Sequence, residues 1–86
     1  MDITLDTRTH EVLRGERQIS LTSKEYCLLE LLMSNPGQVL SRDMIAEHLS
    51  NVIDVYIRYL RRKLCESGEP DVISTIRGFG YQLKEP

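Results

Sequence analysis

The segment Asn51–Leu64, NVIDVYIRYLRRKL, carries the side chains whose types and spacing could do chemistry. Read as a helix, this segment has an apolar stripe on one side and a mostly basic surface on the other. The stripe comprises Ile53, Ile57, Leu60 and Leu64, and the opposite face comprises Asn51, Val55, Arg58, Tyr59 and Arg62. Guanidinium groups can bind guanine edges or phosphates, and a valine can contact a thymine methyl group. The pattern therefore predicts a helix that packs on a core and offers its other face to a DNA major groove.

The same basic face has a simpler interpretation, because a charged helix face is more often only solvated. Asp54 lies four residues before Arg58, so these two could form a surface ion pair worth about 0.3–0.5 kcal/mol. A phosphate would compete readily with so weak a pair. Arg62 has no acidic residue at helical spacing before it, and the turn around Arg77 contains none. We therefore expect Arg62 and Arg77 to be stronger DNA contacts than Arg58.

Length and composition indicate one small globular domain with a modest hydrophobic core. The chain has 86 residues, of which 41% are hydrophobic, and a chain of this size buries only a limited core. No apolar run approaches the roughly 20 residues that a membrane-spanning helix needs. The net charge is −2, but residues 1–50 contribute −3 and residues 51–86 contribute +1. The positive charge is concentrated where one face could meet phosphate, and this placement matters more than the total.

The residues with catalytic or metal-binding chemistry form no recognisable constellation. No metal-ligand spacing is found among Cys27, Cys65, His10 and His48. Neither histidine has the context of a catalytic base, and the glycines of the RGFG segment lie in a hairpin rather than before a helix. The sequence therefore predicts no enzyme, no metal site and no cofactor. We expect Cys27 to be a small core residue, and the lack of a disulfide framework fits a reducing, cytoplasmic setting.

Local patterns position the elements in the first half of the chain. Residues 2–21 alternate apolar and polar side chains around the turn-like segment Arg14–Arg17, which predicts an antiparallel meander of short strands. Thr22 and Glu25 form a T-x-x-E capping box, and the helix that follows should run to about Ser34. That helix is apolar nearly all round, so it must be covered on more than one side.

The second half predicts two further helices and a hairpin. Ser41 is a good N-cap for a second helix from Arg42 to about Leu49, and the third helix follows. Two strands should be joined by a tight turn whose glycines permit positive φ. We therefore expect a single α+β domain over residues 1–86, with an N-terminal sheet (2–21), a three-helix core (22–65) and a C-terminal hairpin (72–83).

Three segments occur together and in order: LTSKEYCLLELLMSNPGQVLSRDMI, NVIDVYIRYLRRKL and ISTIRGFGYQL. In this combination, which ends in an R-G-x-G-Y hairpin, the chain resembles the C-terminal effector domain of OmpR/PhoB-type response regulators over roughly Ile3 to Leu83. The resemblance implies a winged helix-turn-helix fold with an N-terminal antiparallel sheet, three helices and a C-terminal β-hairpin wing. It also implies sequence-specific DNA binding and control of transcription.

The resemblance further implies which residues contact DNA. The third helix matches the recognition helix of the major groove, and Arg77 matches the wing-tip arginine that enters the adjacent minor groove. Phosphates would be contacted beside the recognition helix, along the wing, and at the start of the second helix, where a helix N-terminus also favours an anion. The expected DNA-binding residues are Arg42, Asn51, Val55, Arg58, Tyr59, Arg61, Arg62, Lys63, Thr75, Arg77 and Tyr81.

Tyr59 is a departure from the family, which often has a second arginine at this position. Tyrosine can donate one hydrogen bond or stack, but it cannot form the forked contact to guanine that arginine makes. The base preferred at this position is therefore left open.

The junction between the second and third helices is a larger departure. The family usually has a loop of several residues here, often beginning with tryptophan, and uses it in part to reach RNA polymerase. In this chain His48-Leu49-Ser50 leads directly into Asn51, with no glycine or proline in the junction and no tryptophan in the chain. Three explanations are open: the sequence omits a loop, Leu49–Asn51 is a true short turn, or the helices fuse into one rod, which would require a domain-swapped dimer.

The resemblance implies several partners besides promoter DNA with direct repeats. Family members carry an N-terminal receiver domain, so we expect this chain to be a fragment that begins just after the interdomain linker. They contact RNA polymerase and bind DNA as tandem homodimers, which depends largely on the receiver domain. The acidic net charge and Tyr59 keep an alternative open, in which the chain is a winged-helix protein-interaction module that docks on RNA polymerase or another protein without reading DNA.

Overall fold

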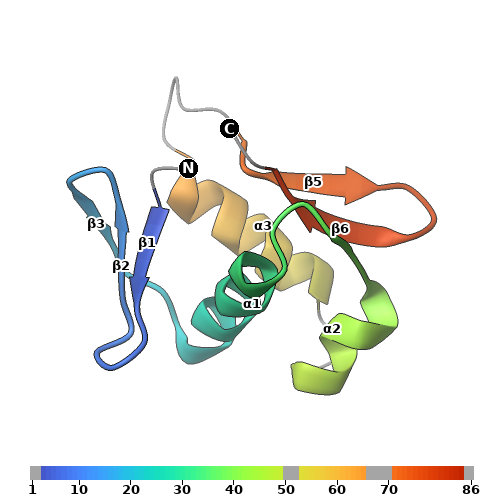
Figure 1. Ribbon diagram of the computed structural model, residues 1–86, viewed down its shortest axis with the longest axis horizontal. Helices are drawn as coiled ribbons and strands as arrows, with labels where there is room; N and C mark the ends of the chain where they lie inside the picture. Colours follow the sequence, from blue (N-terminus) through green and yellow to red (C-terminus); the bar gives the residue numbers. More distant parts are fainter. Residues whose placement is uncertain (1–2, 50–52, 66–70, 85–86) are drawn as a thin grey trace.

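The computed structural model describes residues 3–49, 53–65 and 71–84. Figure 1 shows the N-terminal and C-terminal strands on opposite sides of the view, with α1 and α3 between them. One hydrophobic core joins residues from both sheets and from all three helices of the described chain. The elements are β1 (Ile3–Asp6), β2 (Glu11–Arg14), β3 (Arg17–Ile19), α1 (Ser23–Ser34), β4 (Val39–Ser41), α2 (Arg42–His48), α3 (Ile53–Leu64), β5 (Ile73–Ile76) and β6 (Gly80–Leu83).

The N-terminal sheet is the antiparallel meander that the alternating pattern predicts. Its strands lie in the order β1-β2-β3, and Val12 of β2 pairs with Ile19 of β3. Ile3, Val12 and Ile19 are all buried, so one face of the sheet packs on the core and the other faces solvent. Gly15 has a φ of 62° in the turn between β2 and β3.

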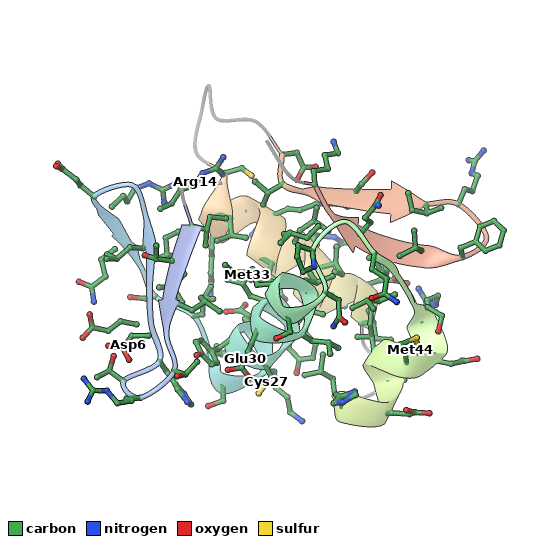
Figure 2. The ribbon with its side chains drawn as sticks, in the orientation of Figure 1. Asp6, Arg14, Cys27, Glu30, Met33 and Met44 are labelled. Carbon is green, nitrogen blue, oxygen red and sulfur yellow. The ribbon has the colours of Figure 1, made fainter. Side chains whose placement is uncertain are left out.

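The capping box at the start of α1 is confirmed. The Thr22 hydroxyl accepts from the backbone N–H of Glu25 at 3.3 Å, and the Thr22 N–H donates to Glu25 Oε1 at 2.9 Å. The helix packs against α3, α2 and β6, and Leu28, Leu29 and Leu32 are fully buried. The expectation that Cys27 belongs to the core is wrong, because its thiol is exposed. At 100° per residue Cys27 lies opposite Leu29 and Leu32, and Figure 2 shows it on the outer side of α1.

A second sheet contains one strand that the sequence did not reveal. Its order is β4-β6-β5, so β6 lies between the hairpin strand β5 and the short strand β4. Gly80 of β6 pairs with Ser41 of β4. A Cβ atom at Gly80 would lie 1.9 Å from the carbonyl oxygen of Leu40, and the residue has a φ of 155°. The second glycine of the R-G-x-G-Y motif is therefore required by the close approach of β4.

The second and third helices are separate elements. α2 ends at His48, and the C-cap residue Leu49 has a φ of −122° and a ψ of −99°, which is outside the helical region. The fused rod is therefore wrong, and the domain-swapped dimer that was derived from it loses its basis. Asn51 lies outside the described residues. The predicted apolar stripe of α3 is confirmed, since all of its members are buried: Ile53, Ile57, Leu60 and Leu64.

Among the described residues, none of the helices combines the length and the apolar character needed to cross a membrane.

Candidate nucleic-acid interface

The outer face of α3 is open to solvent along most of its length. Val55 is 37% exposed and Tyr59 is 41% exposed, and Arg58 and Arg62 are also exposed. Within the described part of the chain, neither arginine forms an ion pair. The structure therefore brings the four predicted groove-facing side chains together on one face, with both guanidinium groups available.

Asp54 does not form the predicted pair with Arg58. Its carboxylate oxygen Oδ1 instead accepts hydrogen bonds from the Arg42 guanidinium and from the Tyr81 hydroxyl. The start of α2 and the strand β6 thus both contact the first turn of α3. The donors that they supply to Asp54 could not be predicted from the sequence of α3 alone. The Tyr81 hydrogen bond, followed by that from Arg42, lowers the pKa of Asp54. Burial, followed by the hydrogen bond to Asp54, raises the pKa of Tyr81.

Arg61 faces the wing instead of lying freely beside the groove. Its Nη2 donates to the backbone carbonyl of Ile73 at 3.0 Å and to the Thr75 hydroxyl at 2.7 Å. Its Nε also lies 3.5 Å from Oδ2 of Asp71. These contacts tie α3 to β5. Thr75 itself is exposed, and its hydroxyl still has a hydrogen to donate to a phosphate.

Lys63 connects α3 to the N-terminus of α1. Its Nζ lies 2.6 Å from Oε1 of Glu25, whose side chain is almost completely buried. Burial tends to raise the pKa of Glu25, but the hydrogen bonds from Lys63 and from the Thr22 backbone outweigh it and lower the pKa overall. Because a buried carboxylate needs such a partner, Lys63 is first of all a structural cation.

Two arginines that the sequence analysis did not select hold the C-terminus of α3. Arg14 is buried and donates from Nη1 to the Leu64 carbonyl at 2.7 Å. Arg17 donates to the carbonyls of Lys63 at 3.2 Å and of Leu64 at 2.9 Å. Figure 2 shows Arg14 reaching from β2 toward the end of α3. Cations satisfy the free carbonyls of a helix C-terminus and oppose its negative dipole end. The only sequence signal was a pair of arginines flanking a turn.

The wing projects beyond the helices and carries the remaining predicted side chains (Figure 1). Arg77 is exposed in its turn, and Gly78 next to it has a φ of 81°. Phe79, which the sequence analysis did not select, is 71% exposed at the same tip. Between the wing and the start of α2 lies a shallow depression of about 300 Å³, lined by residues that include Arg42, Thr75, Arg77 and Tyr81. Two cations and two hydroxyl groups therefore meet around one concave surface.

The chain matches one protein family over most of its length. Residues 15–83 match the family described as "Transcriptional regulatory protein, C terminal". The chain is 52% identical to the response regulator MprA of Mycobacterium sp. (strain KMS) over 93 residues, which cover 99% of this chain and 40% of that protein. The aligned stretch is longer than the 86 residues of this chain, so MprA contains residues that have no counterpart here. The chain spans less than half the length of the response regulators that it matches.

Solved structures give the same answer for the fold. The DNA-binding domain of the response regulator AdeR, in complex with an intercistronic region, superposes with a TM-score of 0.91 at 30% identity, and the match covers 100% of this chain and 97% of that one. The Klebsiella pneumoniae RstA DNA-binding domain, in complex with the RstA box, has a TM-score of 0.86 at 27% identity, covering 98% and 92%. With its three helices, two antiparallel sheets and wing, this chain belongs to the family of C-terminal domains of transcriptional regulatory proteins and is a DNA-binding effector domain of winged-helix fold.

Proposed function

We propose that this chain recognises a specific promoter sequence by inserting α3 into the major groove, as the effector domain of a two-component response regulator. One observation supports this proposal: some charged side chains of α3 contact the rest of the fold, and others face solvent. Asp54, Arg61 and Lys63 are engaged with other elements of the fold, whereas Arg58 and Arg62 point outward without such partners among the described residues. The helix is thereby held rigidly while its outer face stays available for base contacts.

The four outward side chains have different tasks in this proposal. Arg58 and Arg62 can each make a forked contact to guanine or bind a phosphate. Val55 can contact a thymine methyl group, and Tyr59 can stack or donate one hydrogen bond. Each lost base contact should cost about 1–3 kcal/mol and relax specificity at one position.

The wing and the start of α2 would contact the DNA backbone and the minor groove. Arg77 is exposed at the tip of the hairpin and can follow the negative potential of a narrow minor groove. Phe79 beside it offers an apolar surface for the groove wall. Arg42, Thr75 and Tyr81 surround the depression in which we place a phosphate. The DNA-backbone contact proposed for Asn51 rests on the family resemblance.

The same proposal extends to the rest of the protein and to its partners. We infer a receiver domain on the N-terminal side, tandem binding of two copies on a direct repeat, and contact with RNA polymerase. The proposed activity is binding without catalysis, and it takes place in the cytoplasm, where bacterial promoters lie.

Selection from a randomised duplex pool, with sequencing of the enriched DNA, tests the proposal directly. The wild-type chain should enrich a short motif. Arg62→Ala should lose preference at one base position, and Arg77→Ala should lose it in the adjacent A·T-rich stretch. Arg8→Ala is the matched control, because it removes one positive charge from the exposed β1–β2 turn and should leave the motif unchanged.

The opposite result would support a different function. If no motif is enriched, and weak binding to DNA is insensitive to both Arg62→Ala and Arg77→Ala, the chain does not read DNA with these side chains. Docking on a protein such as RNA polymerase would then become the leading explanation of the winged-helix surface.

A further inference from the structure

Asp54 is an acidic side chain at the edge of a surface that should bind an anion. The side chain of Asp54 is 57% exposed, and the side chain of its partner Arg42 is 52% exposed. Arg42 and Tyr81 both line the depression between the wing and α2, and both donate to the same oxygen, Oδ1 of Asp54. A free carboxylate here would repel the DNA backbone, so its presence calls for a functional account.

The Arg42–Asp54 pair has no net charge. Long-range attraction to phosphates and release of counterions depend on net positive charge, so the pair contributes little to binding an arbitrary duplex. The guanidinium has five N–H donors in a fixed plane, and Asp54 engages the Nη1 end. The remaining donors stay available, and they are aimed in one direction because Asp54 fixes the plane.

We propose that Asp54 is a positioning residue that makes the phosphate contact of Arg42 directional. It holds the Arg42 guanidinium, with the Tyr81 hydroxyl donating to the same oxygen, so that the free donors of Arg42 bind a phosphate in one register, and its charge weakens binding to every other register. Phosphate positions follow the local shape of the duplex, so a directional contact discriminates between sequences although it touches no base. This inference rests on the proposed DNA-reading function and adds a residue to it.

The test compares binding to two probes, which are the duplex enriched by selection and a scrambled duplex of the same composition. Asp54→Asn should bind the scrambled duplex about fivefold more tightly, because one negative charge near the phosphates is gone. Binding to the enriched duplex should tighten less, so the ratio of the two affinities falls. Asp54→Glu keeps the charge but moves the carboxylate by one methylene group. It should lower the ratio without tightening binding to the scrambled duplex.

Asp43→Asn is the charge-matched control. Asp43 is exposed in the first turn of α2 next to Arg42, and no described residue forms an ion pair with it. Its removal should change the affinity for both duplexes by the same factor and leave their ratio at the wild-type value.

A double-mutant cycle provides an independent measurement. Arg42→Ala leaves the charge of Asp54 unpaired, so it should weaken binding to the scrambled duplex although the intact pair contributes little to that binding. Adding Asp54→Asn to Arg42→Ala should restore binding to the scrambled duplex but not the affinity ratio. Loss of folded protein would weaken binding to both duplexes by the same factor. The ratio of the two affinities therefore reports the positioning of Arg42 even if a variant is less stable.

Two results would overturn the inference, and they can be told apart. If Asp54→Asn and Asp43→Asn change both affinities by the same factor, Asp54 acts only through its charge, while the DNA-reading function stands. If the wild-type chain binds neither duplex, both the DNA-reading function and the role of Asp54 are lost.

Discussion

The two ends of α3 are attached to the rest of the domain in different ways. At the C-terminal end, buried Arg14 donates to the Leu64 carbonyl, and buried Glu25 accepts a hydrogen bond from Lys63. At the N-terminal end, exposed Arg42 and Asp54 meet beside the wing. Buried polar contacts are strong and cannot be reached by DNA, whereas exposed ones are weaker and leave donors free for a phosphate. The contacts at the C-terminal end therefore serve stability and those at the N-terminal end serve recognition, while the outer face of the helix, which includes Arg62, stays open to DNA.

The largest loss of stability is expected at Gly80, which supports the recognition end through the β4–β6 pairing. Gly80→Ala would place a Cβ atom 1.9 Å from the Leu40 carbonyl oxygen, so β4 or β6 must move. We expect a loss of at least about 3 kcal/mol in unfolding free energy, measured by urea denaturation. Gly78→Ala is the control: its φ is also positive but its Cβ would meet nothing within 4 Å, so the loss should be only about 1–2 kcal/mol. Equal losses would mean that β4 does not constrain Gly80.

Arg14 tests the stability end. Arg14→Leu removes a buried donor to the Leu64 carbonyl, and hydrogen bonds to charged groups are worth about 1.5–3 kcal/mol. We expect a loss of that size in unfolding free energy, while the ratio of affinities for enriched and scrambled duplexes stays at the wild-type value. Arg8→Leu, in an exposed turn, should change stability by less than about 0.5 kcal/mol. A changed affinity ratio in Arg14→Leu would show that both ends of α3 contribute to recognition.

Much of this arrangement could be predicted, because the signals were local. The capping box of Thr22 and Glu25 spans three residues, and the apolar stripe of α3 repeats within one helix. The contacts that define the two ends are different, since they join residues far apart in sequence. Arg14 is separated from Leu64 by 50 positions, and Asp54 from Tyr81 by 27. No helical spacing reveals such partners.

Short or ambiguous patterns account for the other differences. β4 has only three residues, which is too few for an alternating pattern, and its pairing with β6 appears only in three dimensions. Cys27 lies in an apolar run, but the orientation of α1 turns it outward. The Asp54–Arg58 spacing favours an ion pair on an isolated helix, yet packing of α2 and β6 against α3 supplies other donors. Tertiary contacts overrode the local preference in each case.

Glu25 gives a smaller effect that depends on pH. Its pKa is lowered in the folded chain from the ordinary value of 4.5, so its ionised form stabilises the fold above that value, and this contribution is lost as the pH falls through the folded pKa. Glu25→Gln should cost about 1–2 kcal/mol at neutral pH. It should also make the decline of stability below about pH 4.5 less steep. Urea denaturation at several pH values measures this change. Glu47→Gln, an exposed control on α2, should keep the wild-type profile, and an unchanged profile in Glu25→Gln would contradict the assignment.

The smallest effect on stability is expected at Arg62, where the effect on recognition should be large. The side chain is exposed and, within the described ranges, forms no ion pair, so Arg62→Ala should change the unfolding free energy by less than about 0.5 kcal/mol. The same substitution should weaken binding to the enriched duplex by about 1–3 kcal/mol. Arg14→Leu and Arg62→Ala each remove one arginine. Arg14→Leu should lower the unfolding free energy without changing DNA recognition, and Arg62→Ala should weaken DNA recognition without lowering the unfolding free energy. If Arg62→Ala instead destabilises the fold and leaves the enriched motif intact, its guanidinium belongs to the scaffold, and the division of α3 into a stability end and a recognition surface is incorrect.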